Sequence, residues 1–245
     1  MNTVLFDLDG TLLPMDQKAF IDTYFKALSG RLSRLDYDTV KLINAIWQGT
    51  KAMISNDGFL TNEEIFWKTF KEDFKPGGRK LEKTELKKIE RELMKFYKKD
   101  FQVTRLNTWP TPFAKQCVDI LKEKGYQTVV ATNPFFPEVA TRQRIEWAGF
   151  DFEEFELVTT YENTCFCKPN LNYYRRILKT LDKEPVDCLM VGNDVSEDMC
   201  AFEIGIDVFL IDECLINTKG EDTSMFKSGS WSTFKEYVLS LPYLH

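Results

Sequence analysis

The feature that most constrains the fold is a series of short apolar segments that alternate with helical segments. Each apolar segment is continuous, which is typical of strands that are buried on both faces of a parallel sheet. The helices between them provide the crossovers that parallel strands require. The expected strands are 3–8, 127–132, 155–160, 186–192 and 207–211, and the expected helices after residue 109 are 111–125, 137–148, 170–182, 195–204 and 231–240.

A block between the first two strands has a different pattern. Apolar residues recur there at helical spacing, without a strand-like run, and predict helices at 16–35, 38–54, 61–74 and 84–101. The sequence therefore predicts a doubly wound parallel α/β core, residues 1–14 and 109–245, with an inserted all-helical domain, residues 15–108. Its aromatic residues are expected to pack between helices rather than against a substrate, namely Phe20, Trp47, Phe66 and Trp67.

Composition excludes several functional classes. The one histidine, His245, is the last of 245 residues, so Ser-His-Asp, Cys-His and histidine-rich metal sites are not expected. No Walker-type phosphate loop occurs. The net charge of −6 argues against a nucleic-acid partner, and no apolar run is long enough to predict a membrane span. Six cysteines without a signal-peptide pattern favour reduced thiols and a cytoplasmic location.

Polar side chains follow the apolar strands at their carboxyl ends. In parallel α/β sheets these ends meet at one edge, and ligands bind there. The residues concerned are Asp7, Asp9, Thr132, Asn133, Asn193 and Asp194, with Lys168 and Asp198 nearby in the sequence.

These groups together suit phosphoryl transfer. Carboxylates that converge on one point repel one another unless a cation neutralises them, and Mg²⁺ prefers such oxygen ligands. Asp7 could attack a phosphate as a nucleophile, while Asp9, two residues later, could protonate the leaving oxygen. Thr132 and Lys168 could hold phosphate oxygens by a hydrogen bond and by charge.

Four motifs resemble those of the haloacid dehalogenase-like (HAD) superfamily. Residues 5–11, LFDLDGT, resemble its first motif, Thr132 its second, Lys168 its third, and 191–198, VGNDVSED, its fourth. They occur in the family's order, and the resemblance covers residues 1–14 and about 109–212. The helical block 15–108 resembles a cap domain inserted after the first motif, which in this family covers the site and selects substrates.

The resemblance implies a Mg²⁺-dependent phosphohydrolase that acts on a small phosphorylated metabolite through an aspartyl-phosphate on Asp7. Asp9 would be the general acid and base, and its backbone carbonyl would also bind the metal. The other implied roles are phosphate binding by Thr132, Asn133 and Lys168, metal binding by Asp7, Asp9 and Asp194, and support from Asn193 and Asp198.

Several alternatives stay open from the sequence. A phosphomutase would share the same motifs, and a non-catalytic binding protein could share the fold. Many family members have an acidic residue directly after the glycine of the fourth motif, where this chain has Asn193 before Asp194. Asn133 could bind phosphate or only shape the turn before Pro134, and Asp198 could orient a metal-bound water or pair with Lys168.

Overall fold

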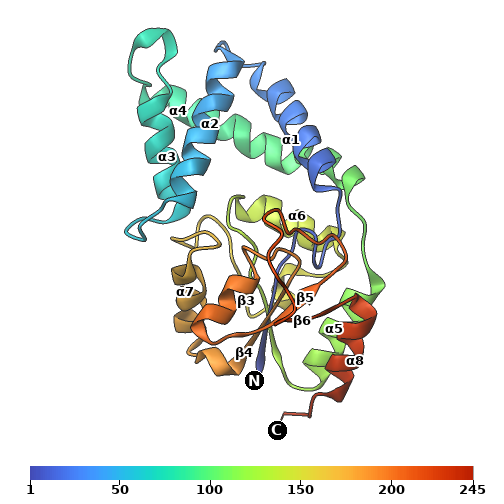
Figure 1. Ribbon diagram of the computed structural model, residues 1–245. Helices are drawn as coiled ribbons and strands as arrows, with labels where there is room; N and C mark the ends of the chain where they lie inside the picture. The colour runs from blue at the N-terminus through green and yellow to red at the C-terminus, as the bar shows by residue number, and fades with distance from the viewer. Residues whose placement is uncertain (245) are drawn as a thin grey trace.

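A six-stranded sheet forms the centre of the computed structural model, which describes residues 1–244 (Figure 1). All neighbouring strands are parallel, and their order is β3-β2-β1-β4-β5-β6. The fold class expected from the sequence is confirmed. The strands are β1 Thr3–Phe6, β2 Gln127–Val130, β3 Leu157–Val158, β4 Cys188–Gly192, β5 Asp207–Ile211 and β6 Lys227–Gly229.

Successive strand residues point to opposite faces of the sheet. Because the central strands carry apolar side chains on both faces, both faces are covered by helices. On β1, Val4 and Phe6 belong to one apolar cluster, whereas Leu5 belongs to another. The first cluster includes residues of α5 (Pro112–Glu123), α6 (Glu138–Trp147) and α8 (Trp231–Ser240). The second includes residues of α7 (Leu171–Leu181) and the 3-10 helix η6 (Met199–Ile204). The core is therefore doubly wound.

A layer of helices lies beyond one end of the sheet, opposite the two chain termini (Figure 1). It contains α1 (Gln17–Leu32), α2 (Thr39–Ile54), α3 (Asn62–Asp73) and α4 (Lys83–Lys95). The two segments that connect it to the sheet run side by side. The Asp16 amide donates to the Asn107 carbonyl at 3.0 Å, and the Trp109 amide donates to the Pro14 carbonyl at 3.0 Å.

The strand order places the first and fourth motifs next to each other. Strand β1 pairs with β2 on one side and β4 on the other, with Phe6 opposite Val191. The connections from β1 run toward β2 and those from β4 run toward β5, so a topological switch point lies between β1 and β4. Ligands bind at such points beyond the carboxyl ends of the strands. This end of the sheet faces the helical layer in Figure 1.

A buried asparagine attaches the helical layer to the loop before Lys168. Asn62, the first residue of α3, has no exposed surface. Its amide N–H donates to the Thr164 carbonyl at 2.8 Å, and its Nδ2 lies 3.4 Å from both the Phe166 carbonyl and Cys167 Sγ. Unpaired polar groups are costly to bury, so this network favours one docking position for α3.

Three sequence expectations need correction. The expected helix 195–204 is a turn followed by η6, in which the Ala201 amide donates to the Asp198 carbonyl three residues earlier, as in a 3-10 helix. The expected helix 84–101 ends at Lys95 and continues as a π-helical turn, Phe96–Asp100, and a 3-10 helix, Phe101–Asn107. The π-helical turn is wider than an α-helical turn, so residues five apart, the fully buried Phe96 and Phe101, lie on the same side of the segment.

The third correction is an additional strand. The short edge strand β6 was not predicted, since its residues Lys-Ser-Gly carry no apolar pattern. Within residues 1–244, no helix is long and apolar enough to cross a membrane. All six cysteines are free thiols. His245 lies outside the described residues.

Replacing Asn62 with alanine should lower the free energy of unfolding by about 1–3 kcal/mol, because several buried groups lose their partner. Chemical denaturation of the variant measures this. Asn172→Ala is the matched control, since Asn172 is exposed and should change stability by less than about 0.5 kcal/mol. Equal effects of the two substitutions would show that the Asn62 network does not stabilise the folded chain.

Candidate active site

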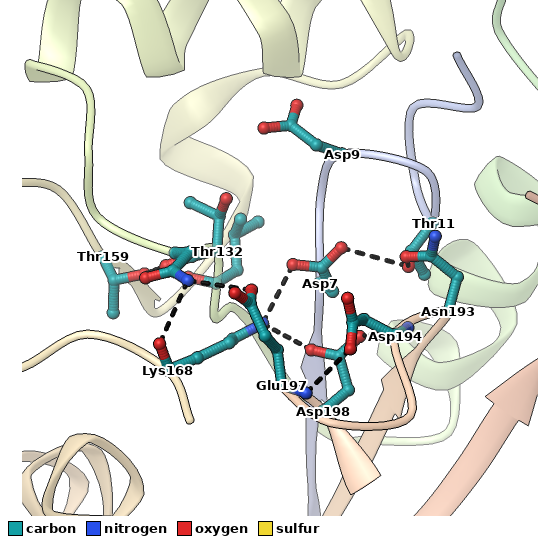
Figure 2. Close-up of polar contacts among 12 residues, drawn as sticks. Asp7, Asp9, Thr11, Thr132, Thr159, Lys168, Asn193, Asp194, Glu197 and Asp198 are labelled. Carbon is teal, nitrogen blue, oxygen red and sulfur yellow. Dashed lines mark hydrogen bonds and ion pairs between the residues drawn. The ribbon is translucent and has the colours of Figure 1, made fainter. Parts of the chain in front are cut away.

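Asp7 lies directly after β1 and is held from three sides. Its amide donates to the Val191 carbonyl of β4 at 2.9 Å. Its carboxylate accepts from Lys168 Nζ at 2.9 Å on Oδ1, and Thr11 Oγ1 lies 3.2 Å from Oδ2 (Figure 2). Only 7% of the residue is exposed, and it lines a cavity of about 320 Å³ beneath the helical layer. Asp7 is therefore oriented and accessible from one direction.

Lys168 is buried between two carboxylates. Its Nζ lies 2.9 Å from Asp7 Oδ1 and 2.6 Å from Asp198 Oδ1. Burial alone would lower the pKa of Lys168, but the charges of Asp198 and Asp7 outweigh it and hold the pKa well above its usual value. The ammonium is thus charged and forms ion pairs with both carboxylates. The sequence left two roles open for Asp198, orienting a metal-bound water or pairing with Lys168. The structure contains the pair with Lys168.

The turn after β4 brings two more carboxylates to the site. Asp198 Oδ2 accepts the Asp194 amide at 3.0 Å, and burial raises the pKa of Asp198 to about 7, with Lys168 opposing the shift. A Cβ on Gly192 would lie 2.1 Å from Asp198 Oδ2, so only glycine allows this approach. Asp194 Oδ1 accepts the amides of Ser196 and Glu197 at 2.8 and 2.9 Å. Asp194 thereby lines the cavity beside Asp7.

Asn193 connects the first and fourth motifs. Its Oδ1 accepts from Thr11 Oγ1 at 2.9 Å, and its Nδ2 donates to the Cys214 carbonyl at 2.7 Å. The residue is 1% exposed and fits against Gly10, where a Cβ would lie 2.4 Å from Asn193 Nδ2. Gly10 also has a φ of 91°, which favours glycine. Both ends of the Asn193 amide are engaged, so it supports the loop that carries Asp9.

Asp9 points away from the other carboxylates, toward α6 (Figure 2). Its Oδ2 forms an ion pair with Arg144, which has no exposed surface. Arg144 also contacts Thr141 Oγ1 at 3.1 Å and lies over the Phe136 ring. Within residues 1–244, Asp9 Oδ1 is buried without a hydrogen-bond partner. Burial raises the pKa of Asp9 against the lowering effect of Arg144, and the Asp7 charge adds to the rise.

Thr132 and Asn133 follow β2 and line the same cavity. The Thr132 carbonyl accepts from Thr159 Oγ1 at 2.8 Å and from the Tyr173 hydroxyl at 2.9 Å, which fixes the turn. Asn133 Nδ2 donates to Glu197 Oε2 at 2.8 Å, so a phosphate would compete with Glu197 for that donor. The Asn133 side chain thus connects the second motif to the turn after β4.

Three residues at the site were not singled out from the sequence. Thr11 and Glu197 lie within the quoted motifs, and their side chains could have been expected to point inward with their neighbours. Arg144 gave no signal, because it stands in a helix that contains charged residues throughout. Only the fold shows that Arg144 reaches Asp9.

The donor set fits a hard cation that keeps several water ligands. Asp7 and Asp194 supply carboxylates, while the Asp9 side chain is turned to Arg144, so Asp9 could contribute only its backbone carbonyl. Within residues 1–244, no three histidine, cysteine or acidic side chains form a metal cluster. Mg²⁺ needs no such cluster, because it is commonly bound by one or two carboxylates together with water and substrate phosphate.

A family model, haloacid dehalogenase-like hydrolase, matches residues 1–203 of the chain. The chain belongs to this family. The match includes all four motifs and the helical layer. Among curated proteins, none matches the chain.

Solved structures of HAD proteins share the fold over almost the whole chain. A HAD phosphatase from Thermococcus onnurineus is 19% identical, with 100% of both chains covered and a TM-score of 0.58. A predicted phosphoglycolate phosphatase from Haemophilus somnus 129PT is 16% identical, with 97% of each chain covered and a TM-score of 0.57. An L-2-haloacid dehalogenase from Xanthobacter autotrophicus is 15% identical, with 98% of this chain and 99% of the dehalogenase covered and a TM-score of 0.57. At these identities the likeness shows the fold alone.

The structure predicts different roles for Asn193 and Asp194. Asn193→Ala should lower the free energy of unfolding by about 1–3 kcal/mol, since Thr11 and the Cys214 carbonyl lose their partner. Asp194→Asn keeps an oxygen for the amides of Ser196 and Glu197 and should affect stability less. It should instead raise the Mg²⁺ concentration needed for half-maximal activity, because a charged ligand is lost.

Denaturation curves and Mg²⁺ titrations of both variants measure the two effects. The assignment is wrong if Asn193→Ala abolishes the Mg²⁺ dependence while Asp194→Asn titrates like the unmodified protein.

Proposed function

We propose that this protein is a Mg²⁺-dependent phosphohydrolase that cleaves phosphate monoesters through an aspartyl-phosphate on Asp7. The observation that carries the proposal is the position of Asp7 at the floor of the cavity, between Lys168 and Thr11, with Asp9 lining the same cavity. A carboxylate held in this way is a fixed nucleophile, and the lysine beside it stabilises negative charge on a phosphate.

The first step transfers the phosphoryl group to the protein. An oxygen of Asp7 forms a bond to phosphorus while the bond from phosphorus to the ester oxygen breaks. Lys168 lies 2.9 Å from Asp7 Oδ1 and can bind a phosphoryl oxygen at the same time as the carboxylate. The Thr132 hydroxyl, at the carboxyl end of β2, is the second phosphate ligand that we propose. Bound Mg²⁺, held by Asp7, Asp194 and the Asp9 carbonyl, would screen the phosphate charge from the nucleophile.

Asp9 moves the proton in both steps. Its Oδ1 has no partner among the described residues, while Oδ2 is held by Arg144. Burial raises the pKa of Asp9, which is the direction that a general acid needs, and the protonated Asp9 gives its proton to the departing alcohol oxygen. The resulting carboxylate then takes a proton from water as that water attacks phosphorus. Phosphate leaves, and Asp7 is regenerated.

We further propose that residues 15–108 form the cap domain of this enzyme. The paired entry and exit segments, at Asp16–Asn107 and Pro14–Trp109, support this division. Helices α1 and α2 supply much of the cavity wall above Asp7. Water is therefore limited where the acyl phosphate forms, and the side chains of the cap contact the leaving group.

A dehalogenase is the competing activity, since solved dehalogenases share the fold. Family dehalogenases typically lack an acidic residue at the position of Asp9. An acid that protonates a leaving alcohol is needed for an ester but not for a halide ion. The presence of Asp9 in the cavity lining therefore favours the phosphatase.

Asp7→Asn should abolish phosphate release, because a neutral amide cannot form the covalent intermediate. Release of phosphate from p-nitrophenyl phosphate with Mg²⁺ measures this. The control is Asp22→Asn, which removes an exposed carboxylate of α1 that pairs with Lys18. Retention of more than about a tenth of the activity by Asp7→Asn would exclude Asp7 as the nucleophile.

Asp9→Asn should slow hydrolysis of an alkyl phosphate by roughly 10²–10⁴-fold and of p-nitrophenyl phosphate far less, since nitrophenolate leaves without a proton. The ratio of the two rates is measured on one preparation, so any unfolded fraction caused by unpaired Arg144 cancels. Equal losses on both substrates would reject the acid role of Asp9.

A further inference from the structure

The cavity above Asp7 is polar at its floor and apolar on its walls. Its floor carries the carboxylates described above together with Thr132 and Asn133. The walls come from α1, α2 and the loop after β2. Their large apolar side chains include Phe20, Ile21, Phe25, Trp47, Ile54 and Phe136.

Several wall residues are exposed to an unusual degree for their size. Ile21 is 44% exposed, Trp47 is 43% exposed and Ile54 is 49% exposed. All three line this one cavity. Exposed apolar residues scattered singly need no explanation, but a group of them around a cavity marks a surface that an apolar ligand would cover.

The sequence predicted Phe20 and Trp47 only as packing residues. Phe20 does pack edge-to-face on Phe101, with ring centroids 6.0 Å apart, and Trp47 stacks on Phe25 at 5.1 Å. Both also line the cavity, which the helical spacing did not reveal. The stacked pair of Trp47 and Phe25 thus gives the wall a rigid aromatic surface.

The polar groups on the walls are mostly satisfied within the protein. The Tyr24 hydroxyl is hydrogen bonded to the Tyr97 hydroxyl at 3.0 Å, and Thr50 Oγ1 donates to the Ile46 carbonyl at 3.0 Å. Gln17 is the other polar wall residue. Among the described residues that line the cavity, none is basic, whereas five are acidic. A second anionic group on a ligand would therefore be repelled and would find no cation.

We propose that the substrate is a phosphate monoester of an uncharged, mainly apolar alcohol, such as an alkyl or aryl phosphate. This inference rests on the proposed function, because it places the phosphate on Asp7 and the leaving group against α1 and α2. The cavity, about 320 Å³, has the size of a small-molecule site. Phosphorylated acids and bisphosphates are disfavoured substrates.

The first test compares kcat/KM for ethyl, butyl and hexyl phosphate with that for a hexyl phosphate bearing a terminal carboxylate. The alkyl alcohols have similar leaving-group pKa values, so differences report contacts with the wall. Each added methylene should raise kcat/KM about fourfold until the cavity is filled. The terminal carboxylate should lower it at least tenfold. A flat series, or a preference for the carboxylate, overturns the proposal.

The second test does not need turnover. Calorimetry with Mg²⁺ measures the binding of hexylphosphonate and of the same phosphonate with a terminal carboxylate. The uncharged compound should bind at least tenfold more tightly, and equal affinities contradict the inference. If no ester is hydrolysed but this preference holds, the hydrolase activity fails and the apolar site stands. If esters are hydrolysed without any preference, the hydrolase activity stands and the apolar site fails.

A charge placed on the wall should reverse the preference. Ile54→Lys adds a cation at an exposed wall position, so it should lower kcat/KM for hexyl phosphate and raise it for the carboxylated ester. Val40→Lys is the matched control, because Val40 is on the same helix, is 68% exposed and does not line the cavity. The same change in both variants, or no change in Ile54→Lys, would show that the leaving group does not contact this wall.

Discussion

Three charged groups are buried together where β1 and β4 end, and the site depends on their balance. Two carboxylates alone, Asp7 and Asp198, would repel each other and take up protons. Lys168, 2.9 and 2.6 Å from them, offsets part of this repulsion through two ion pairs. Removal of one partner from such a group typically costs about 3–5 kcal/mol, because it leaves a buried charge uncompensated. The same ion pair orients the Asp7 side chain that we propose as the nucleophile.

The rest of the site follows from the need to hold these charges in place. Gly192 lacks the Cβ that would displace Asp198, and Asn193 ties the first motif to the fourth through Thr11. Asn62 joins the helical layer to the loop that ends at Lys168. The layer that we propose as the cap is therefore attached beside the charged group itself, and its apolar wall lies directly above a polar floor.

The sequence allowed the sheet and the strand-end residues to be predicted, for a physical reason. Asp7 and Asp194 interrupt or follow apolar runs whose length and alternation with helices predict buried strands, and parallel strands bring such ends together. Arg144 could not be predicted, since its contact with Asp9 depends on how α6 packs. The cavity wall could not be predicted either, because a residue such as Trp47 shows the same helical periodicity whether it packs in a core or lines a cavity.

The most direct test of the account is to trap the covalent intermediate. The protein, turning over p-nitrophenyl phosphate with Mg²⁺, is quenched in acid and reduced with borohydride, which converts an acyl phosphate of aspartate into homoserine. Peptide mass spectrometry should find homoserine at position 7, only when substrate was present, and not in Asp7→Asn. Reduction at another carboxylate, or none at position 7 during measured phosphate release, would contradict an aspartyl-phosphate on Asp7.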